Sequence, residues 1–334
     1  MKILAFETSC DDTSIALFEN EKLISMHTKS QIKIHNETWW VVPEVASREH
    51  ANVIFDVLGD VLQEGNAKLT DIDYLAVTTH PGLVPSLLTG ITVASTLSQT
   101  LQIPILPIDH IQAHIFSNFL ERQESEITFP LCCLTVSGWH NEVYYMPDMW
   151  TREKLWQTQD DAAGEAFDKV AKMMGLWYPG GPIISKLADE FNWNSKKLFP
   201  RVFLEKSEFW FSFSGLKSAV KREVDSRWEL SDEDKREISY EFQSAVNEVL
   251  CYKLLEAAKQ KNVSTILLAG GVSANDDLNN KISLESEKNW LKFFAPIKKL
   301  YCMDNAAMIG ILAYYRIKYG QFEEKIWTLE VGKW

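Results

Sequence analysis

His110 and His114 are four residues apart in the segment DHIQAHIF, a spacing that places both imidazoles on one face of a helix. Two histidines arranged in this way can bind one metal ion. A zinc protease of the H-E-x-x-H type would need a glutamate after the first histidine as general base, but Ile111 stands there. The pair therefore indicates either a metal site or two histidines that serve packing and hydrogen bonding, and it disfavours a protease.

A second group of chemistry-bearing residues is acidic and lies near the start of the chain. The segment ETSCDDTS brings Glu7, Asp11 and Asp12 into one loop after a short apolar run. Three carboxylates this close repel one another unless a cation, hydrogen-bond donors or water compensate. The loop is therefore a candidate catalytic or ion-binding element. Glu7 has a second interpretation, in which it accepts hydrogen bonds from local backbone N–H groups.

Two glycine turns could bring the backbone close to a nucleotide. In LLAGGVSAN an apolar strand would end at Gly270, and a helix N-terminus, which favours phosphate, would follow near Asn275. The segment matches neither GxGxxG nor the Walker A loop, so it disfavours Rossmann and P-loop folds and leaves an ordinary tight turn as the alternative. The second glycine turn is Tyr178-Pro179-Gly180-Gly181. It ends a run whose apolar residues have helical spacing, and Asp168 lies on this run.

The elements that must position these residues alternate between strands and helices. This alternation predicts an α/β fold. Two strand-loop-strand openings with polar loops, TSCDDT and SGWHN, suggest two related lobes with a boundary near residues 123–130. The predicted strands are 2–7, 14–18, 74–79, 103–108, 131–136, 142–145 and 265–268, and the predicted helices include 47–62, 83–100 and 304–319.

Composition limits the possible classes of protein. The 334 residues suffice for two lobes, each with its own core. No apolar run approaches the roughly 18 residues of a membrane span, and the five cysteines include no CxxC motif, so we expect a cytoplasmic protein with no membrane partner. The net charge of −12 argues against a general polyanion binder.

The chain resembles the universal tRNA threonylcarbamoyltransferase family, the TsaD proteins, in nine blocks that occur in family order. The resemblance implies the actin-like ATPase architecture: two ribonuclease-H-like lobes with a nucleotide and metal cleft between them. It suggests an N-terminal lobe at 1–126, to which a C-terminal helix at 305–334 returns, and a C-terminal lobe at 127–304. The blocks are ETSCDDTS, VVPEVASREH, PGL, DHIQAH, VSGWHNE, TQDDAAGEAFDKVAKMMGLWYPGGP, FSFSGLKSA, LLAGGVSAN and CMDNAAMIG.

The resemblance also implies roles for individual residues. Asp304 becomes the third ligand, with His110 and His114, of one divalent metal ion, iron or zinc. Asp11 and Glu7 become the candidate catalytic residues, and the acidic loop faces an ATP-type nucleotide or adenylate, with or without magnesium. The implied substrate-binding residues, which would contact an acyl-adenylate, are Thr135, Val136, Ser137, Gly138, Trp139, Asp168, Gly181 and Asn275.

The implied reaction transfers a threonylcarbamoyl group from threonylcarbamoyl-adenylate to the adenosine 3′ of the anticodon in tRNAs that decode ANN codons. The implied partners are tRNA, a paralogous actin-like-fold subunit and a P-loop ATPase subunit. Two rivals are an actin-like-fold ATPase or small-molecule kinase and a non-catalytic scaffold paralogue. A local basic patch could bind tRNA, although for any single residue a solvated surface charge is the favoured interpretation; the candidates are Lys196, Lys197, Arg201, Lys217, Lys221 and Arg222.

Tryptophan is unusually frequent, with 12 residues against only 15 glycines. Trp39, Trp40, Trp139 and Trp156 fall where the family has glycine, and Asn192-Trp193-Asn194 and Asn289-Trp290 look like Asn-Gly turns. We hypothesise that the source reads UGA as glycine and that these residues are glycines in the natural protein; the alternative is a divergent homologue with genuine tryptophans. His80 and Asn141 also depart from the family pattern, at a usual glycine and threonine.

Overall fold

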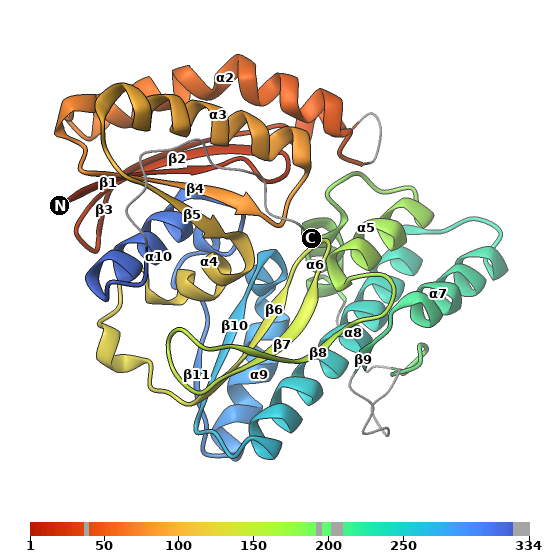
Figure 1. Ribbon diagram of the computed structural model, residues 1–334. Coiled ribbons are helices and arrows are strands. Elements are labelled where there is room, and N and C mark those ends of the chain that lie inside the picture. The colour runs from red at the N-terminus through yellow and green to blue at the C-terminus, as the bar shows by residue number, and fades with distance from the viewer. Residues whose placement is uncertain (37–39, 192–195, 202–209, 323–334) are drawn as a thin grey trace. The chain divides into compact units, whose positions relative to one another are not determined.

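A computed structural model describes residues 1–36, 40–191, 196–201 and 210–322 (Figure 1). Trp39 and Trp193 lie outside the described residues. The chain forms two compact units, Met1–Glu124 with Pro296–Trp334, and Ser125–Ala295. The divisions fall after residues 124 and 295, where the sequence predicted 126 and 304. The segment that contains Asp304 therefore belongs to the first unit, with His110 and His114.

The first unit contains a five-stranded sheet with the order β3-β2-β1-β4-β5. β1, β4 and β5 run parallel, whereas β1, β2 and β3 form an antiparallel meander. The carboxyl ends of parallel strands meet at one edge of a sheet, so the acidic loop, the PGL turn and HIQAH all begin at this edge. The strands are β1 (Lys2–Glu7), β2 (Asp12–Glu19), β3 (Lys22–Ser30), β4 (Tyr74–His80) and β5 (Ile105–Asp109).

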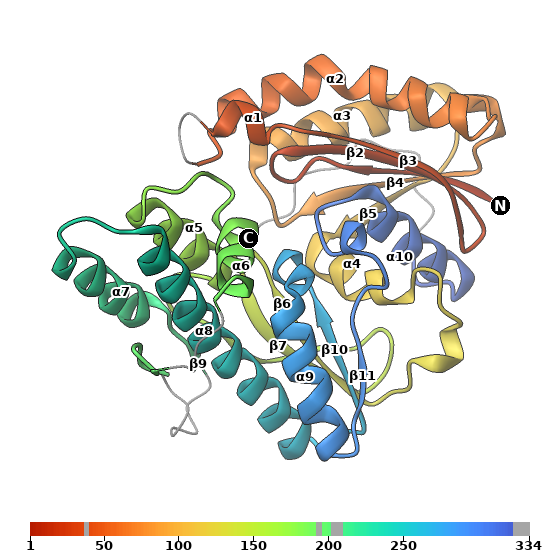
Figure 2. The same ribbon diagram turned by 180° about the vertical axis from the view of Figure 1, so that it is seen from behind.

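Helices cover both faces of this first sheet. α2 (Pro43–Glu64) and α3 (Val84–Leu101) lie on one face, and α4 (His110–Phe116) and α10 (Ala306–Lys318) lie on the other (Figures 1 and 2). The short α1 (Ile32–His35) precedes α2. The apolar faces of α2 and α3 pack on buried strand residues such as Leu4 and Phe6. α10 approaches the sheet closely because Gly310 has no side chain: a Cβ there would lie 2.4 Å from the Phe18 ring.

The second unit contains a six-stranded sheet with the order β11-β10-β6-β7-β8-β9. Its core order β8-β7-β6-β10-β11 repeats the β3-β2-β1-β4-β5 pattern of the first unit, with an antiparallel meander followed by parallel strands. The expectation of two related lobes agrees with this repeated topology. The strands are β6 (Leu131–Val136), β7 (Asn141–Met146), β8 (Glu153–Thr158), β9 (Trp210–Phe211), β10 (Thr265–Ala269) and β11 (Lys292–Phe294).

The helices of the second unit supply most of its core. Apolar side chains of the long helix α8, such as Phe242 and Leu250, pack with Phe167 of α5 and with the strands. The helices are α5 (Ala163–Met173), α6 (Gly180–Asp189), α7 (Ser214–Ser226), α8 (Asp232–Gln260) and α9 (Asp276–Lys288).

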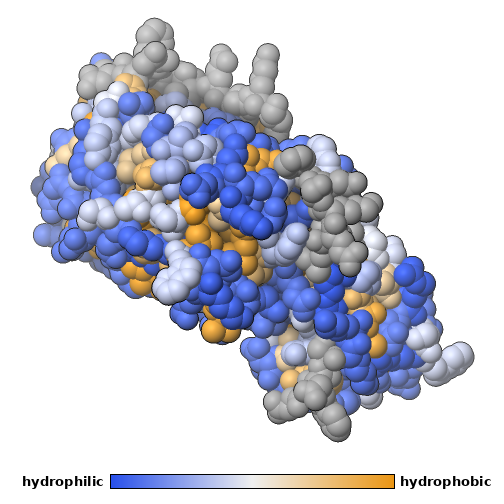
Figure 3. All heavy atoms as spheres, turned by 90° about the horizontal axis from the view of Figure 1, so that it is seen from below, coloured by the Kyte–Doolittle hydropathy of each residue, from blue (hydrophilic) through white to orange (hydrophobic). Residues whose placement is uncertain are grey.

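The face of the protein shown in Figure 3 is covered mostly by hydrophilic residues, with smaller patches of hydrophobic ones. Among the described residues, no helix combines the length and apolar character that crossing a membrane requires.

Trp290 occupies a backbone position that suits glycine. Helix α9 ends with a left-handed residue, Trp290, at φ 58°. The Trp290 N–H donates to the Glu287 carbonyl at 3.3 Å, and the Leu291 N–H donates to the Ser286 carbonyl at 3.0 Å. This is the Schellman ending of a helix, in which the left-handed position is usually glycine. The observation agrees with the glycine interpretation of Asn289-Trp290.

The other described tryptophans that we assigned to glycine positions, Trp40, Trp139 and Trp156, do not have left-handed backbones. Trp40 and Trp139 are exposed, whereas Trp156 is buried in the core, with the Lys253 Nζ atom 5.3 Å from its ring centroid. Trp139 therefore does not occupy a left-handed backbone position that would require glycine. At these three positions, the hypothesis depends on the family pattern and not on backbone conformation.

Trp290→Gly is expected to raise the free energy of unfolding by about 1 kcal/mol, because a side chain in the left-handed region costs ~1–2 kcal/mol and glycine escapes most of this cost. The Trp290 side chain is exposed, so little burial is lost. Urea unfolding of the purified proteins measures the difference. Trp228→Gly is the matched control: Trp228 is also fully exposed but lacks a left-handed backbone, and no gain is expected. Equal or lower stability of Trp290→Gly would contradict the glycine interpretation of this turn.

Candidate metal centre and nucleotide-binding edge

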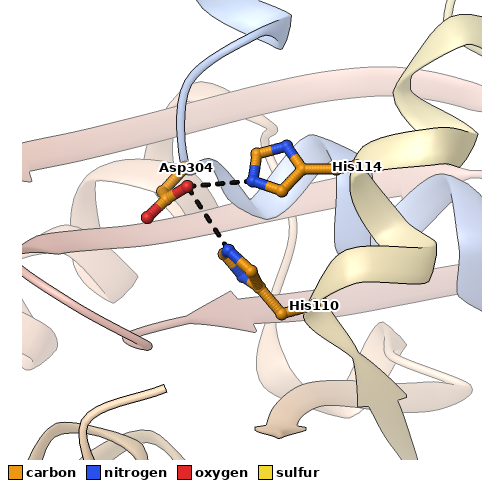
Figure 4. Close-up of side chains that lie close together, drawn as sticks. All are labelled: His110, His114 and Asp304. Atoms are coloured by element: carbon orange, nitrogen blue, oxygen red, sulfur yellow. Dashed lines mark hydrogen bonds and ion pairs between the residues drawn. The ribbon is translucent and has the colours of Figure 1, made fainter. Parts of the chain in front are cut away.

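The structure brings His110, His114 and Asp304 together in the first unit (Figure 4). The Asp304 Oδ1 atom lies 3.0 Å from His114 Nε2 and 3.5 Å from His110 Nε2. One ligand atom from each residue lies within 4.8 Å of the other two. Two imidazole nitrogens and a carboxylate fit zinc or ferrous iron and leave open coordination positions, as catalytic metal sites require.

Helix caps place the three candidate ligands. The Asp109 carboxylate accepts a hydrogen bond from the Gln112 N–H at 3.0 Å, which starts α4 at His110 and puts His114 one turn later. The Asn305 side chain accepts from the Met308 N–H at 3.1 Å, which starts α10 directly after Asp304. The two helices are tied together, because Arg316 donates to the Gln112 side chain at 2.7 Å.

Glu7 lies behind the triad and contacts His110. Glu7 is fully buried, and its Oε2 atom lies 3.1 Å from His110 Nδ1. The same carboxylate accepts hydrogen bonds from the Ser9 N–H at 2.5 Å and from the Thr78 hydroxyl at 2.6 Å. When Nδ1 of His110 donates to Glu7, its Nε2 is left free for a metal ion. Glu7 therefore accepts local backbone donors, as one interpretation held, and it also orients a candidate ligand.

The charges of this cluster shift one another's pKa values. Burial alone would lower the pKa of His110, but Asp304 and Glu7 outweigh it and hold this pKa well above its usual range. Burial, together with the neighbouring His110, lowers the pKa of His114. Burial alone would raise the pKa of Asp304, but attraction to His110 leaves it well below its ordinary value. Without metal, the His110 imidazolium thus compensates the carboxylates, a role that a bound cation can take over.

The acidic loop lies beside this cluster. Burial raises the pKa of Asp11, and repulsion from Asp304 raises it further. Burial, followed by repulsion from Asp11, raises the pKa of Asp12 to about 7. The Asp12 Oδ1 atom is buried and has no hydrogen-bond partner among the described residues. The loop thus holds two partly buried carboxyl groups whose ionised forms are disfavoured in the absence of a cation.

Asp12→Asn is expected to remove a pH-dependent loss of stability. The folded state binds the Asp12 proton more tightly than the unfolded state, whose aspartate pKa is near 3.8. The stability that the protonated Asp12 contributes is therefore complete below the unfolded-state pKa of 3.8, and it is lost as the pH rises through the folded-state pKa of about 7. The difference between the folded-state and unfolded-state pKa of Asp12 corresponds to about 4 kcal/mol of folding free energy. Urea unfolding of both proteins, with chelator, should show the advantage of Asp12→Asn growing between about pH 4 and pH 8; parallel pH curves would exclude this effect.

The PGL turn supports the acidic loop from the next strand. The Leu83 N–H donates to the Ser9 carbonyl at 2.7 Å. Gly82 permits this approach, since a Cβ there would lie 2.7 Å from the same carbonyl oxygen. His80, which replaces a family glycine, is partly exposed and lies 3.6 Å from the Asp109 carboxylate. His80 therefore lies against Asp109, the residue before His110, and not against the triad itself.

Most of the predicted substrate-binding residues gather at one edge of the second sheet. Thr135 and Val136 end β6, and Ser137, Gly138 and Trp139 form the turn into β7. The Ser137 hydroxyl oxygen accepts hydrogen bonds from the Trp139 N–H at 3.3 Å and the His140 N–H at 3.0 Å, which closes the turn. The Trp139 side chain is 63% exposed.

Two glycines hold neighbouring segments against this turn. Gly270 has φ 86°, and a Cβ there would lie 2.4 Å from the Val136 carbonyl oxygen. Gly164, in the first turn of α5, donates its N–H to the Ser137 carbonyl at 3.2 Å. A Cβ at Gly164 would lie 2.8 Å from the Gly138 Cα. The Ser-Gly turn, the Gly-Gly turn and the N-terminus of α5 thus form one edge with closely approaching backbones, which is what a nucleotide site needs.

The remaining predicted substrate residues lie on α5, on α6 and directly before α9. The Asp168 carboxylate of α5 accepts a hydrogen bond from the Gly180 N–H at 2.7 Å and so positions Gly181 in the first turn of α6. Asn275 caps α9 by accepting from the Leu278 N–H at 2.8 Å. Its side chain also donates to Gln243 at 2.7 Å and accepts from Asn247 at 3.1 Å. The Asn275 side chain is thus engaged within its own unit.

Several residues that position the site were not predicted from the sequence. Gln243 and Asn247 are buried polar residues on the apolar face of α8, a signal that helical periodicity could have revealed. Asp160 accepts hydrogen bonds from Ser212, Ser214 and the Phe213 N–H, and so joins the FSFSGLKSA block to the block that contains α5. His50, in the SREH segment, contacts both sides of the acidic loop.

Four of the six candidate tRNA-binding cations form ion pairs with acidic residues in the described part of the chain, namely Lys196, Arg201, Lys217 and Lys221. The Lys196 Nζ atom lies 2.6 Å from Glu237, Arg201 Nε lies 2.9 Å from Glu248 and Lys221 Nζ lies 3.0 Å from Asp225. Lys217 pairs with Asp161, which also binds Lys169 at 2.6 Å. These partners neutralise much of the charge, which favours the alternative in which these side chains are ordinary surface charges.

Comparison with known proteins places the chain in a family. A model of the TsaD family, tRNA N6-adenosine threonylcarbamoyltransferase, matches residues 22–311. Among relatives of that name, the protein from Persephonella marina is 43% identical, over 95% of this chain and 91% of its own. The protein from Thermodesulfovibrio yellowstonii is 42% identical over 97% of each chain, and one from Staphylococcus aureus is 41% identical over 96% of this chain and 93% of its own.

Solved structures share the fold at low sequence identity. Full-length HypF, in a phosphate- and nucleotide-bound form, is 13% identical with a TM-score of 0.63, over 98% of this chain and 56% of HypF. Component A of the (R)-2-hydroxyglutaryl-CoA dehydratase of Acidaminococcus fermentans is 12% identical with a TM-score of 0.56, over 95% of this chain and 99% of that one. These likenesses confirm the predicted α/β fold of the actin-like ATPase class. The family match and the identities of 41–43% show that the chain belongs to the TsaD family of tRNA N6-adenosine threonylcarbamoyltransferases.

Proposed function

We propose that this protein transfers the threonylcarbamoyl group of threonylcarbamoyl-adenylate to the exocyclic amine of the adenosine 3′ of the anticodon in tRNAs that decode ANN codons. One observation carries the proposal: in a member of this family, His110, His114 and Asp304 converge within 4.8 Å. A sugar kinase or ATPase of the same fold does not need this triad. A scaffold paralogue that had lost catalysis would be expected to lack it.

The three converging residues are the proposed ligands of one divalent ion, zinc or iron. When bound, the ion supplies Lewis acidity toward an oxygen of the donor. Glu7 supports this role by orienting His110 from its buried side. Binding and orientation of the already activated donor are expected to contribute more than acid–base chemistry, because positioning alone can supply several kcal/mol.

The edge of the second sheet supports adenylate binding. We assign the donor contacts to the Thr135–Trp139 segment, Asp168 and Gly181, because closely approaching backbones and two helix N-termini gather there. Asn275 is assigned through its position at the start of α9, and its side chain keeps the helix cap in place. An adenylate or ATP-type nucleotide, with or without magnesium, fits this donor set.

Asp11 is the proposed catalytic carboxylate. The acceptor amine attacks the carbamoyl carbon of the donor, the bond to the phosphate oxygen breaks, AMP leaves and the amine loses a proton. Burial, followed by repulsion from Asp304, raises the pKa of Asp11, which makes its carboxylate a stronger base for this proton. Glu7 contributes by positioning, since it is fully buried and occupied by Ser9, Thr78 and His110.

The proposed partners are tRNA, a paralogous subunit of the same fold and a P-loop ATPase subunit, in the cytoplasm. An apolar groove of about 450 Å³ between α2 and α3 supports a protein partner that covers it with apolar side chains. Phe55 and Leu88 in this groove are 65% and 47% exposed, an unusual exposure for large apolar side chains. Because four candidate cations are paired within the chain, we expect partner subunits to supply part of the affinity for tRNA.

Trp139→Gly is expected to tighten binding of an adenylate by about tenfold or more, which is at least ~1.4 kcal/mol. The exposed indole stands on the turn whose backbone is assigned to the donor, and its removal opens that approach. Calorimetric titration with AMP or a non-hydrolysable ATP analogue measures the change. Trp228→Gly, at a fully exposed site after α7, is the control. Equal affinity in all three proteins would show that the turn tolerates the indole and would weaken the glycine-codon hypothesis.

A label-transfer experiment distinguishes the proposed function from its rivals. The glycine-restored protein is the variant that has glycine at the tryptophans assigned to glycine positions: Trp39, Trp40, Trp139, Trp156, Trp193 and Trp290. This protein and its partner subunits are incubated with donor labelled in the threonyl group and with an ANN-decoding tRNA. We expect label to appear in acid-precipitable tRNA, with release of AMP. If ATP phosphorylates a hexose and no label appears in tRNA, the kinase is favoured. If this protein shows neither reaction while a homologue transfers label under the same conditions, the scaffold is favoured.

A further inference from the structure

His50 of α2 reaches both sides of the acidic loop and is completely buried. Its Nε2 atom lies 2.9 Å from the Cys10 carbonyl oxygen, directly before Asp11. Its Nδ1 atom lies 2.7 Å from the Thr13 hydroxyl, directly after Asp12. One imidazole therefore brackets the two aspartates of the loop.

These contacts define which ring nitrogen carries the proton. A carbonyl oxygen only accepts hydrogen bonds, so Nε2 of His50 must carry a hydrogen and donate it to Cys10. Nδ1 is then the acceptor of the Thr13 hydroxyl hydrogen. Burial lowers the pKa of His50, which favours the neutral ring that this arrangement needs. Both nitrogens are thus used by the loop backbone and its flanking hydroxyl.

The loop needs such support because its carboxylates repel one another. Asp11, Asp12 and the nearby Asp304 are all acidic, and the Asp12 Oδ1 atom has no hydrogen-bond partner among the described residues. On the opposite side, the Gln31 N–H donates to the Asp11 carbonyl at 3.0 Å, and the Gln31 side chain donates to the Ala46 carbonyl of α2 at 3.2 Å. Helix α2 therefore holds the loop from two directions.

We infer that His50 is a positioning residue that fixes the backbone of residues 10–13, so that Asp11 is presented in a single orientation to the substrates. This role depends on the proposed function through Asp11. A merely structural histidine would affect stability, whereas a positioning residue would affect turnover in a protein that stays folded. His50 lies outside the candidate metal ligands and does not contact them in any described hydrogen bond.

Three variants separate these possibilities. His50→Leu removes both hydrogen bonds, His50→Gln keeps a side-chain N–H that can donate to Cys10, and Thr13→Val removes only the hydroxyl. We expect His50→Leu to lower kcat by about 100-fold with little change in KM and in zinc affinity, and His50→Gln to recover to within about fivefold of the original chain. Thr13→Val should lie between them. Unchanged kcat in His50→Leu, or equal loss in His50→Leu and His50→Gln, would overturn the inference.

Two readouts remain valid even if the chain does not modify tRNA. Nitrogen NMR of histidine-labelled protein, with His50→Gln to assign the signal, should show a neutral ring protonated on Nε2. Hydrogen exchange should be faster at the amides of residues 10–13 in His50→Leu, with no change in α9 of the second unit. An Nδ1-protonated or charged ring, or unchanged loop exchange, would contradict the role of His50. Absence of product with the glycine-restored protein that retains His50, assayed with its partner subunits, would instead contradict the proposed function.

Discussion

Asp304→Ala is expected to yield a folded protein that binds much less metal and transfers the threonylcarbamoyl group about a thousandfold more slowly, a loss of ~4 kcal/mol. Asp304 supplies the carboxylate of the candidate site, and its Oδ1 atom lies closest to the Nε2 atoms of His110 and His114. Without it, two imidazoles remain, and the buried His110 loses the charge that raises its pKa most. His110→Ala is expected to have a similar effect, because it removes one of the two nitrogens.

Metal content of the purified variant, measured by mass spectrometry after zinc or iron loading, tests this expectation together with the transfer rate. Met303→Ala is the matched control, since Met303 precedes Asp304 and its side chain is 44% exposed. Circular dichroism verifies folding. Full transfer activity of Asp304→Ala after treatment with a chelator would show that these three residues are not the metal site.

Glu7→Gln is expected to weaken metal binding by about 10- to 100-fold, the usual cost of losing a partner behind a metal-bound histidine. Glutamine has almost the same shape as glutamate, so the fold should persist. It lacks the negative charge that attracts His110, and its amide can present a donor toward Nδ1 instead of an acceptor. His110 would then lose the preference for the tautomer that leaves Nε2 available to a metal.

A cobalt titration followed by visible absorbance reports both the affinity and the coordination geometry. Thr78→Val is the control, because it removes one hydrogen bond to Glu7 but keeps the contact of Glu7 with His110. We expect a smaller effect from this control. A cobalt affinity of Glu7→Gln equal to that of the original chain would assign Glu7 to loop support alone.

Much of the fold could be predicted from short-range patterns. Alternating and continuous apolar runs predicted β1, β4, β6 and β10, and the helical spacing of the apolar residues in 166–174 predicted α5. β8 was not predicted, because its sequence EKLWQT is polar and half-exposed and reads as a loop. β8 pairs with β7 through the backbone, and a sequence does not display such pairing.

The candidate site could be predicted only in part, for the same reason. The spacing of His110 and His114 is local and readable, but Asp304 lies 190 residues from His114 and was assigned only through the family pattern. The contact of Glu7 with His110 spans 103 residues, and that of His50 with Cys10 spans 40. The basic residues were visible as charges, and the pair Lys221–Asp225 has a local i,i+4 spacing that the sequence displays. The acidic partners of Lys196, Arg201 and Lys217 lie on other elements, so the neutralisation of these three could not be predicted.

The most direct test of the proposed function is mass spectrometry of nucleosides from tRNA treated with the glycine-restored protein, its partner subunits and threonylcarbamoyl-adenylate. An unmodified ANN-decoding tRNA is compared with the same tRNA carrying guanosine in place of the adenosine 3′ of the anticodon. We expect threonylcarbamoyladenosine in the first tRNA and none in the second. Its absence from both, in a preparation where a TsaD relative succeeds, would contradict the proposed transferase activity.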